Sequence, residues 1–188
     1  MKNLKTIAIA ILAFTSVAVT AQNKKVNVSK STISWVGKKV TGQHEGTVNL
    51  QDGTLVMKAG KLTGGSFTVD MNSITVTDLK AGQGKEKLEG HLKNDDFFAT
   101  DKFSTATLVF KTIANKGKGV YTVTADLTIK GKTNPVKFDI TVGANSATTK
   151  FNIDRAKYDV KYGSGSFFQN LGDKTINDEF EIAVNLVF

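Results

Sequence analysis

The chain contains 188 residues, with 25 Lys and Arg against 17 Asp and Glu, which gives a formal net charge of +8, and it has no cysteine. The absence of cysteine excludes a disulfide framework, a thiolate metal site and a lipid-modified N-terminal cysteine. The lysines are scattered among Thr, Val and Gly with only short doublets, so they do not form the basic cluster that a nucleic-acid partner requires.

The first 21 residues have the pattern of a secretory signal peptide. Lys2 and Lys5 precede an apolar run from Ile7 to Val19, and the residues up to Ala21 fit a small-residue cleavage site. The apolar run is shorter than the roughly 20 residues that a membrane-spanning helix needs. We therefore expect residues 1–21 to be removed, residues 22–188 to fold as one domain, and the protein to act in the periplasm or outside the cell.

Most of the remaining chain consists of short segments in which apolar and polar residues alternate. The clearest is YTVTADLTI, where every second residue from Tyr121 to Ile129 is apolar. This period of two indicates a strand with one buried face. Comparable segments, all expected to be strands, occupy residues 31–40, 46–50, 53–62, 64–76, 106–113, 136–142, 148–160 and 178–188.

Turn signals separate these segments, as in KGKTNP at residues 130–135, which joins two strands into a hairpin. This pattern, with 17 glycines in the chain, indicates an all-β antiparallel fold. A lipocalin-like barrel of about eight strands removes exposed strand edges and encloses either a filled core or one ligand. The 12 phenylalanines favour a large apolar interior without deciding between those two.

One segment interrupts the strands. In GKEKLEGHLK, residues 84–93, Leu88 and Leu92 are spaced four apart among charged residues, which predicts one short helix with a single apolar side. A second irregular segment, residues 162–174, separates the last two strands and is expected to hold a helical turn.

The two histidines do not form a recognisable metal site. His44 and His91 lie far apart in the sequence, so a site would have to combine them with Asp95 or Asp96 across the fold. We expect instead that each imidazole ring hydrogen-bonds to backbone near the end of an element. The sequence therefore predicts neither a metal nor another cofactor.

The acidic and serine residues do not form a recognisable catalytic group either. Asp95 and Asp96 are adjacent, so on an extended segment they point in opposite directions, and we expect one of them to cap a turn. No G-x-S-x-G motif is present, and GSGSFF at residues 163–168 lacks the third glycine of a dinucleotide loop. Asp154 and Arg155 are expected to form a surface or rim ion pair, with the alternative that Arg155 meets a polar headgroup. The chain is therefore predicted not to be an enzyme.

Several stretches resemble the YceI-like family of exported bacterial proteins. The family pattern H-L-x-S-x-D-F-F is similar to residues 91–98, HLKNDDFF, with Asn94 where serine is common. The pattern G-x-Y-x-V-x-G-x-L-T-I-x-G-x-T-x-P is similar to residues 119–135, with Ala125 where glycine is common. The resemblance continues through FNIDRAKYDVKYGSGSFF and GDKTINDEFEIAVNL, so it covers essentially the whole mature chain in order.

The resemblance implies a lipocalin-like barrel whose interior holds a long apolar molecule, either a polyisoprenoid such as a quinone tail or a fatty-acid-like amide. It places residues 91–98 beside the barrel mouth. Leu92, Phe97 and Phe98 are then expected to wall the opening, and His91 is expected to brace the loop through hydrogen bonds.

Together, alternation and resemblance predict non-enzymatic binding, transport or storage of a long isoprenoid-like lipid. The residues expected to contact it are Trp35, Phe67, Val69, Met71, Leu88, Leu92, Phe97, Phe98, Phe110, Leu127, Phe138, Phe151 and Ile153. Three alternatives stay open: a fatty-acid or fatty-amide binding protein, an enzyme that uses a histidine on a lipid headgroup, and a stress-related interaction domain without a pocket. Transient membrane contact and a homodimer are both compatible with the sequence.

Overall fold

The described part of the chain is built mainly of antiparallel strands. A computed structural model describes residues 21–188, and the predicted signal peptide lies almost entirely in residues 1–20, outside the described residues. The strands are β1 (Ala21–Lys25), β2 (Thr32–Lys39), β3 (Gly42–Lys58), β4 (Lys61–Val76), β5 (Thr105–Gly117), β6 (Val120–Ile129), β7 (Lys132–Val142), β8 (Ser146–Asp154) and β9 (Ile176–Val187). The helical elements are α1 (Lys85–Lys93) and three 3-10 turns, η1 (Val28–Lys30), η2 (Arg155–Tyr158) and η3 (Gly172–Lys174).

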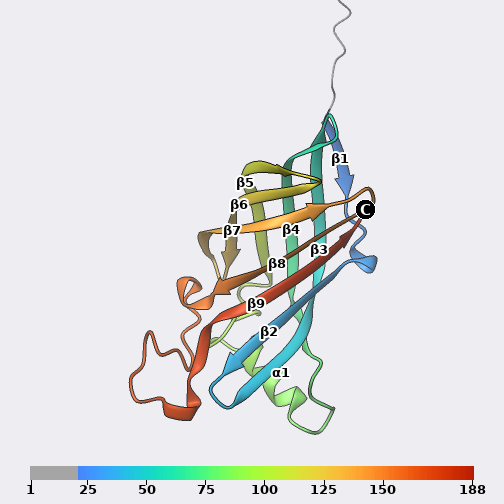
Figure 1. The fold of residues 1–188 in the computed structure, drawn as a ribbon. Coiled ribbons are helices and arrows are strands. Elements are labelled where there is room, and N and C mark those ends of the chain that lie inside the picture. Colours follow the sequence, from blue (N-terminus) through green and yellow to red (C-terminus); the bar gives the residue numbers. More distant parts are fainter. Residues whose placement is uncertain (1–20) are drawn as a thin grey trace, which may run out of the picture.

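Eight of the strands close into a barrel (Figure 1). The order is β3-β2-β9-β8-β7-β6-β5-β4, and β4 pairs back with β3. Strand β1 pairs with Thr54–Lys58 of β3, whereas β2 pairs with Gly42–Val48, so the two halves of β3 have different outer neighbours. The structure confirms the predicted all-β, lipocalin-like barrel with one α-helix. No helix within residues 21–188 is long and apolar enough to cross a bilayer.

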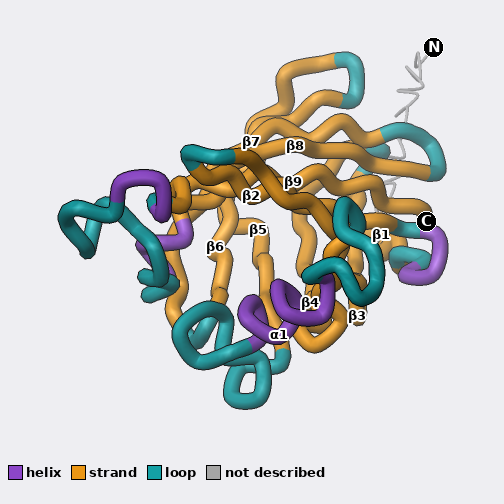
Figure 2. Tube along the Cα trace, turned by 90° about the horizontal axis from the view of Figure 1, so that it is seen from below, coloured by secondary structure: helices purple, strands orange, loops and turns teal. Residues whose placement is uncertain are grey.

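The alternation of β6 has the predicted structural effect. All five residues predicted to face inward, from Tyr121 to Ile129, are buried at 0–7% exposure, while the residues between them are only partly buried. Figure 2 views the barrel from the end at which α1 lies and shows the strands arranged in a ring. Each strand therefore contributes one apolar face to a common interior.

Two predicted strands, 46–50 and 53–62, proved to belong largely to one. Residues Gly42–Lys58 form the continuous strand β3, and β4 begins at Lys61 after a tight turn. The register between β3 and β4 shifts at three places, including between Leu50 and Asp52. Such bulges let a long strand bend around the barrel without breaking, which is why the polar residues at 51–53 did not end it.

The predicted strand 148–160 ends earlier than expected. Strand β8 stops at Asp154, whose carboxylate accepts a hydrogen bond from the backbone N–H of Ala156 (3.0 Å) and starts the turn η2. The turn ends at Asp159, which has a left-handed φ of 61°. A side-chain cap therefore overrides the apparent alternation of residues 155–160.

The short helix and the later helical turn were both predicted correctly. Helix α1 buries Leu92 and is fixed to β4 through Glu89, whose carboxylate accepts a hydrogen bond from the backbone N–H of Val76 (2.8 Å). The pairing of β4 with β5 ends at Asp70, and the contact with Glu89 occupies the part of the β4 edge beyond that point. The turn η3 lies within the irregular segment 162–174.

Gly46 is a position where the barrel wall leaves no room for a side chain. It pairs with Trp35 across β2 and β3, and a Cβ atom at residue 46 would lie 1.9 Å from the carbonyl oxygen of Thr75 and 2.5 Å from the Trp35 ring. We predict that Gly46→Ala lowers the free energy of unfolding by about 3 kcal/mol, because backbone must shift. Urea unfolding measures this effect. Gly37→Ala, where no atom lies within 4 Å of the added Cβ, is the control, and equal midpoints for the two variants would contradict the prediction.

Candidate ligand cavity

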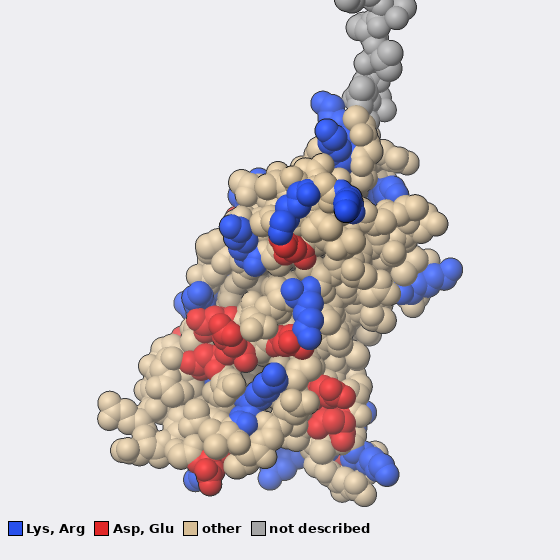
Figure 3. Space-filling view, viewed as in Figure 1, with Lys and Arg blue, Asp and Glu red and all other residues tan. Residues whose placement is uncertain are grey.

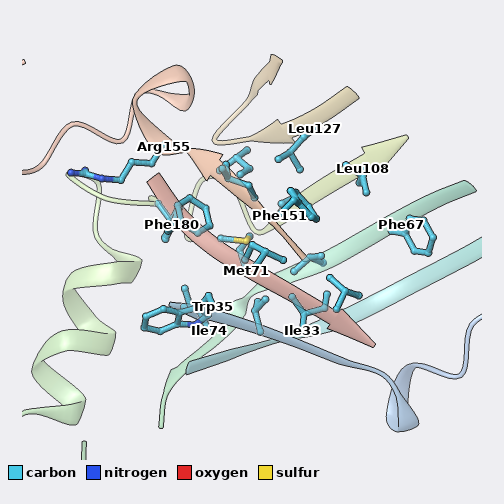
Figure 4. Close-up of a pocket in the computed structure, with 18 of the residues that line it drawn as sticks. Ile33, Trp35, Phe67, Met71, Ile74, Leu108, Leu127, Phe151, Arg155 and Phe180 are labelled. Atoms are coloured by element: carbon cyan, nitrogen blue, oxygen red, sulfur yellow. The ribbon is translucent and has the colours of Figure 1, made fainter. Parts of the chain in front are cut away.

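The barrel contains an apolar cavity of about 190 Å³, and Figure 4 shows residues that line it. Side chains from β2, β3, β4, β5, β6, β7, β8 and β9 line it, together with residues of the loop that follows α1. Almost all of the lining atoms are carbon. Thr149, Arg155 and Asn177 are the lining residues with hydrogen-bonding side chains apart from Trp35.

Twelve of the 13 residues predicted to contact a ligand lie in this lining. They are Trp35, Phe67, Val69, Met71, Leu92, Phe97, Phe98, Phe110, Leu127, Phe138, Phe151 and Ile153. Leu88 does not line the cavity and packs against the core as a half-buried residue. Contact between these residues and a ligand stays a prediction.

The structure adds lining residues that the sequence prediction omitted. The largest group lies on β9 and consists of Ile176, Phe180, Ile182, Val184 and Leu186, and others are Ile33, Val48, Leu50, Ile74, Ala106, Leu108, Ile129 and Ile140. The β9 group alternates with period two in the sequence. The same signal that identified β6 was therefore available for β9.

An aromatic cluster walls the α1 end of the cavity. The rings of Phe97 and Phe98 lie 5.1 Å apart, and Phe98 is 6.4 Å from Phe180. The loop returns onto the helix, because the backbone N–H of Phe98 donates to the carbonyl of Leu92 (3.1 Å). Leu92, Phe97 and Phe98 are each at most 8% exposed. They are therefore packed wall residues at the place that the family resemblance implies.

His91 does not brace this loop through hydrogen bonds, contrary to the prediction. Its Nε2 is buried without a partner among the described residues, and its Nδ1 is 3.9 Å from the Asp96 carboxylate. The ring instead packs edge-on against Phe97 (5.6 Å) and Tyr162 (4.3 Å). Asp95 pairs with Lys102 (2.5 Å), and neither aspartate was found to cap the turn after α1. His91 therefore contributes through ring packing, and Asp95 through a surface ion pair, in place of the hydrogen bonds that were expected.

His44 is also bonded differently from the expectation. Its Nδ1 lies 2.8 Å from the carboxylate of Asp78, which also accepts a hydrogen bond from the backbone N–H of Glu45 (3.0 Å). Burial would raise the pKa of Asp78, but the hydrogen bonds from Glu45 and His44 outweigh it and hold the pKa below the ordinary value. Within residues 21–188, no three His, Cys, Asp or Glu residues are grouped to hold a metal ion. Neither histidine lines the cavity.

Arg155 is a buried structural residue rather than part of a surface ion pair. It is 2% exposed, and its guanidinium donates to the carbonyls of Asn177 (3.0 Å), Val160 (2.9 Å), Tyr162 (2.8 Å) and Ile176 (3.0 Å). Its ionic partner is Asp178 (3.4 Å), whereas Asp154 caps η2. A guanidinium has five N–H groups, of which four donate to these carbonyls, while the Asp178 carboxylate neutralises the charge. Protein groups therefore hold most of the Arg155 guanidinium.

We predict that Arg155→Met lowers the free energy of unfolding by about 3–5 kcal/mol, because it leaves buried carbonyls without a donor and the Asp178 carboxylate without its ionic partner. Thermal or urea unfolding measures the change. The control is Lys157→Met on the same turn, where the lysine is 62% exposed and the expected change is within about 0.5 kcal/mol. Similar losses in the two variants would show that Arg155 does not organise this end of the barrel.

Asp178 makes the same region sensitive to acid. Burial would raise the pKa of Asp178, but hydrogen bonds from Ser164 and Ser166 and the charge of Arg155 outweigh it and hold the pKa below the ordinary 3.8. A lowered folded-state pKa means that the charged form stabilises the fold fully above 3.8, and that this contribution is lost as the pH falls through the lower value. We predict that the unfolding free energy falls more steeply in acid for the wild type than for Asp178→Asn. Parallel urea titrations at a series of pH values test this, and identical slopes would contradict it.

An eight-stranded antiparallel barrel around an apolar cavity belongs to the lipocalin-like class of ligand-binding folds. Residues 25–188 match the YceI-like domain, and the chain belongs to this family. Among curated relatives, a UPF0312 protein of Shewanella denitrificans is 36% identical over 91 residues, which are 48% of this chain and 45% of the relative. A UPF0312 protein of Staphylococcus aureus is 44% identical over 74 residues, or 39% and 40% of the two chains. These matches span less than half of the relatives.

Solved structures agree over a larger share of the chain. BcnA of Burkholderia cenocepacia has a TM-score of 0.68 at 27% identity and covers 87% of this chain and 99% of its own. A polyisoprenoid binding domain from Saccharophagus degradans has a TM-score of 0.58 at 15% identity, with 89% and 97% covered. The YceI protein of Campylobacter jejuni has a TM-score of 0.52 at 14% identity, with 96% and 90% covered. The last two likenesses show the fold.

Proposed function

We propose that the protein binds a long isoprenoid-like lipid, such as a polyprenyl chain or the tail of an isoprenoid quinone, and carries or stores it unchanged. The observation that supports this most directly is the apolar cavity, which draws its lining from eight strands. An apolar cavity of about 150 Å³ is large enough to stay dry and to bind benzene. A cavity of about 190 Å³ with a carbon lining therefore favours hydrocarbon over water.

The free energy gained by burying a tail is comparable in size to the free-energy cost of association. Each buried methylene contributes about 0.8 kcal/mol, so a five-carbon isoprene unit contributes about 4 kcal/mol at most. Three units give about 12 kcal/mol, against an association cost of about 4–15 kcal/mol. Affinity is therefore expected to depend on tail length more than on the headgroup.

The wall chemistry favours a neutral lipid over a fatty acid. A carboxylate inside the cavity would need a cationic partner, and the guanidinium of Arg155 is already occupied by protein groups. The cavity contradicts the alternative of a domain without a pocket. Because neither His44 nor His91 lines the cavity, the geometry also favours binding over headgroup chemistry. The polyisoprenoid binding domain with the same fold gives further support for the ligand class.

We further propose that residues 1–21 direct export and that the protein acts in the periplasm. An exported carrier with an enclosed cavity would shield an insoluble tail from water between membranes. Fractionation of the native cell, followed by determination of the N-terminal residue, tests both points. A chain that begins at Met1 and stays in the cytoplasm would contradict them.

The ligand proposal is tested with the chain's single tryptophan, Trp35, which lies in the cavity wall. Titration with isoprenoid quinones of increasing tail length should change the Trp35 fluorescence, with affinity rising at least about tenfold per added unit while the cavity can accept it. A tail-free quinone ring should give no comparable binding. Equal affinities for the ring and the tailed molecules would refute the proposal.

A matched pair of variants on β5 separates the cavity from the outer surface. Leu108 lines the cavity, whereas its neighbour Val109 points outward and is 44% exposed. We expect Leu108→Trp to fill the cavity and to lower the lipid extracted per protein, as measured by mass spectrometry, while Val109→Trp leaves it unchanged. Equal lipid content in both variants, with both folded, would place the ligand elsewhere.

A further inference from the structure

Exposed apolar side chains gather at the α1 end of the barrel. The most exposed large hydrophobic residues between 21 and 188 are Val28, Val40, Val109, Tyr162, Phe167 and Phe168. Four of these six lie in the β2–β3 turn or in residues 161–175, which we call the aromatic loop. Val40 is 62% exposed, and the three aromatic residues are 45–48% exposed.

The β2–β3 turn and the aromatic loop form one surface. The backbone N–H of Val40 donates to the carbonyl of Thr175 (3.2 Å), and Lys39 pairs with Ile176 at the start of β9. Figure 1 shows both segments at the same end as α1. The cavity lies directly behind this surface, since Ile176 and Asn177 line it immediately after the loop.

The aromatic loop is held in place although its phenylalanines are exposed. Ser164 is fully buried, and its carbonyl accepts hydrogen bonds from the backbone N–H groups of Phe167 (3.2 Å) and Phe168 (3.0 Å). The hydroxyl of Ser166 donates to Asp178 (2.6 Å). The fold thus orders the backbone while it leaves two adjacent aromatic rings in water, an arrangement that is typical of an interaction site.

The charges around the aromatic rings are predominantly basic. Residues 162–172 contain no charged side chain. The corner of the molecule at the lower left of Figure 3 is correspondingly tan, the colour of uncharged residues. The exposed basic residues in or beside the turn and the loop are Lys38, Lys39, Lys161 and Lys174, against the neighbouring acids Asp159 and Asp173, a formal surplus of +2 (4 minus 2). Lys161 also lies over the Phe167 ring (5.1 Å).

We propose that the aromatic loop and the β2–β3 turn dock on the surface of a phospholipid bilayer that contains anionic headgroups. Aromatic rings flanked by lysines match the interfacial region of a bilayer, where rings enter the headgroup layer and lysines contact anionic lipid. This inference rests on the proposed function, because a lipid cargo would enter or leave the cavity at a membrane. Docking at this end places the aromatic wall of the cavity next to the bilayer.

The test is sedimentation with phosphatidylcholine vesicles that contain increasing fractions of phosphatidylglycerol. Binding should rise with the anionic fraction and fall as salt is added. The variant Phe167→Ser/Phe168→Ser should lower the partition coefficient at least about tenfold. The matched control is Val28→Ser/Val109→Ser, which removes two comparably exposed residues away from the α1 end and should leave binding unchanged. Equal losses in both variants, or no wild-type binding, would overturn the proposal.

Two further measurements separate docking from cavity binding. The Phe167→Ser/Phe168→Ser variant should keep its Trp35 response to a tailed quinone in solution but load more slowly from vesicles. If the wild type retains lipid but does not bind vesicles, only the docking proposal is refuted. If no response depends on tail length, the proposed function is refuted. If light scattering shows a wild-type dimer that this variant abolishes while vesicle binding persists, the surface serves a second copy and the docking assignment is wrong.

Discussion

The pairing of β2 with β9 is the constraint on which the rest of the structure depends. It joins the first and last barrel strands along the chain, so that the described sheet becomes a closed barrel rather than an open layer. Closure forces every inward side chain to face the others across a space whose width is set by the number of strands. Eight strands leave a narrow interior, and rings such as Phe67, Phe110 and Phe138 line it without closing it completely.

The number of backbone-paired residues between neighbouring strands differs around the barrel. Strands β7 and β8 share a register of only three residue pairs, from Ile140 with Thr149 to Val142 with Ala147. Beyond Thr149, side chains replace the backbone ladder: the Thr149 hydroxyl donates to the carbonyl of Asp139 (2.6 Å), and Phe138 stacks on Phe151 at 4.6 Å. Apolar packing therefore seals this part of the cavity where backbone hydrogen bonds do not.

The sequence predicted elements whose signal is local. The period of two in β6 is uninterrupted, and its inward residues are buried as expected. The same period predicted the cavity residues Phe67, Val69, Met71, Phe110 and Phe138 on β4, β5 and β7. Bulges were not predictable, because the shift between Leu50 and Asp52 depends on how β3 pairs with β4 and leaves no mark in the composition. Strand β1, AQNKK, carries no alternation and forms only because β3 offers an edge.

The residues that were misjudged depend on distant partners. Arg155 looked like a surface residue beside Asp154, but its carbonyl partners extend to Asn177, more than 20 residues along the chain. His44 meets Asp78 at the open end of the β3–β4 hairpin, opposite its turn, and His91 packs against Tyr162 from the aromatic loop. A charged or aromatic residue in the sequence indicates that its side chain needs a partner but does not identify that partner. The partner is known only when the closed barrel brings distant segments together.

The two ends of the barrel differ in a way that bears on how a ligand enters. At the end away from α1, tight turns join β3 to β4 and β5 to β6, and residues such as Ala59 and Lys118 hold left-handed conformations there. The α1 end has the tight β2–β3 and β6–β7 turns but also two long connections, at 77–104 and 155–175. Side chains hold these long connections together: Lys130 donates to the carbonyls of Asp95 (2.8 Å) and Asp159 (3.2 Å). Tight hairpins cannot separate without breaking the ladder, whereas long connections held by side chains can move while the strands stay paired. Entry of a tail at the α1 end therefore disturbs the barrel least, and the same end carries the exposed aromatic rings.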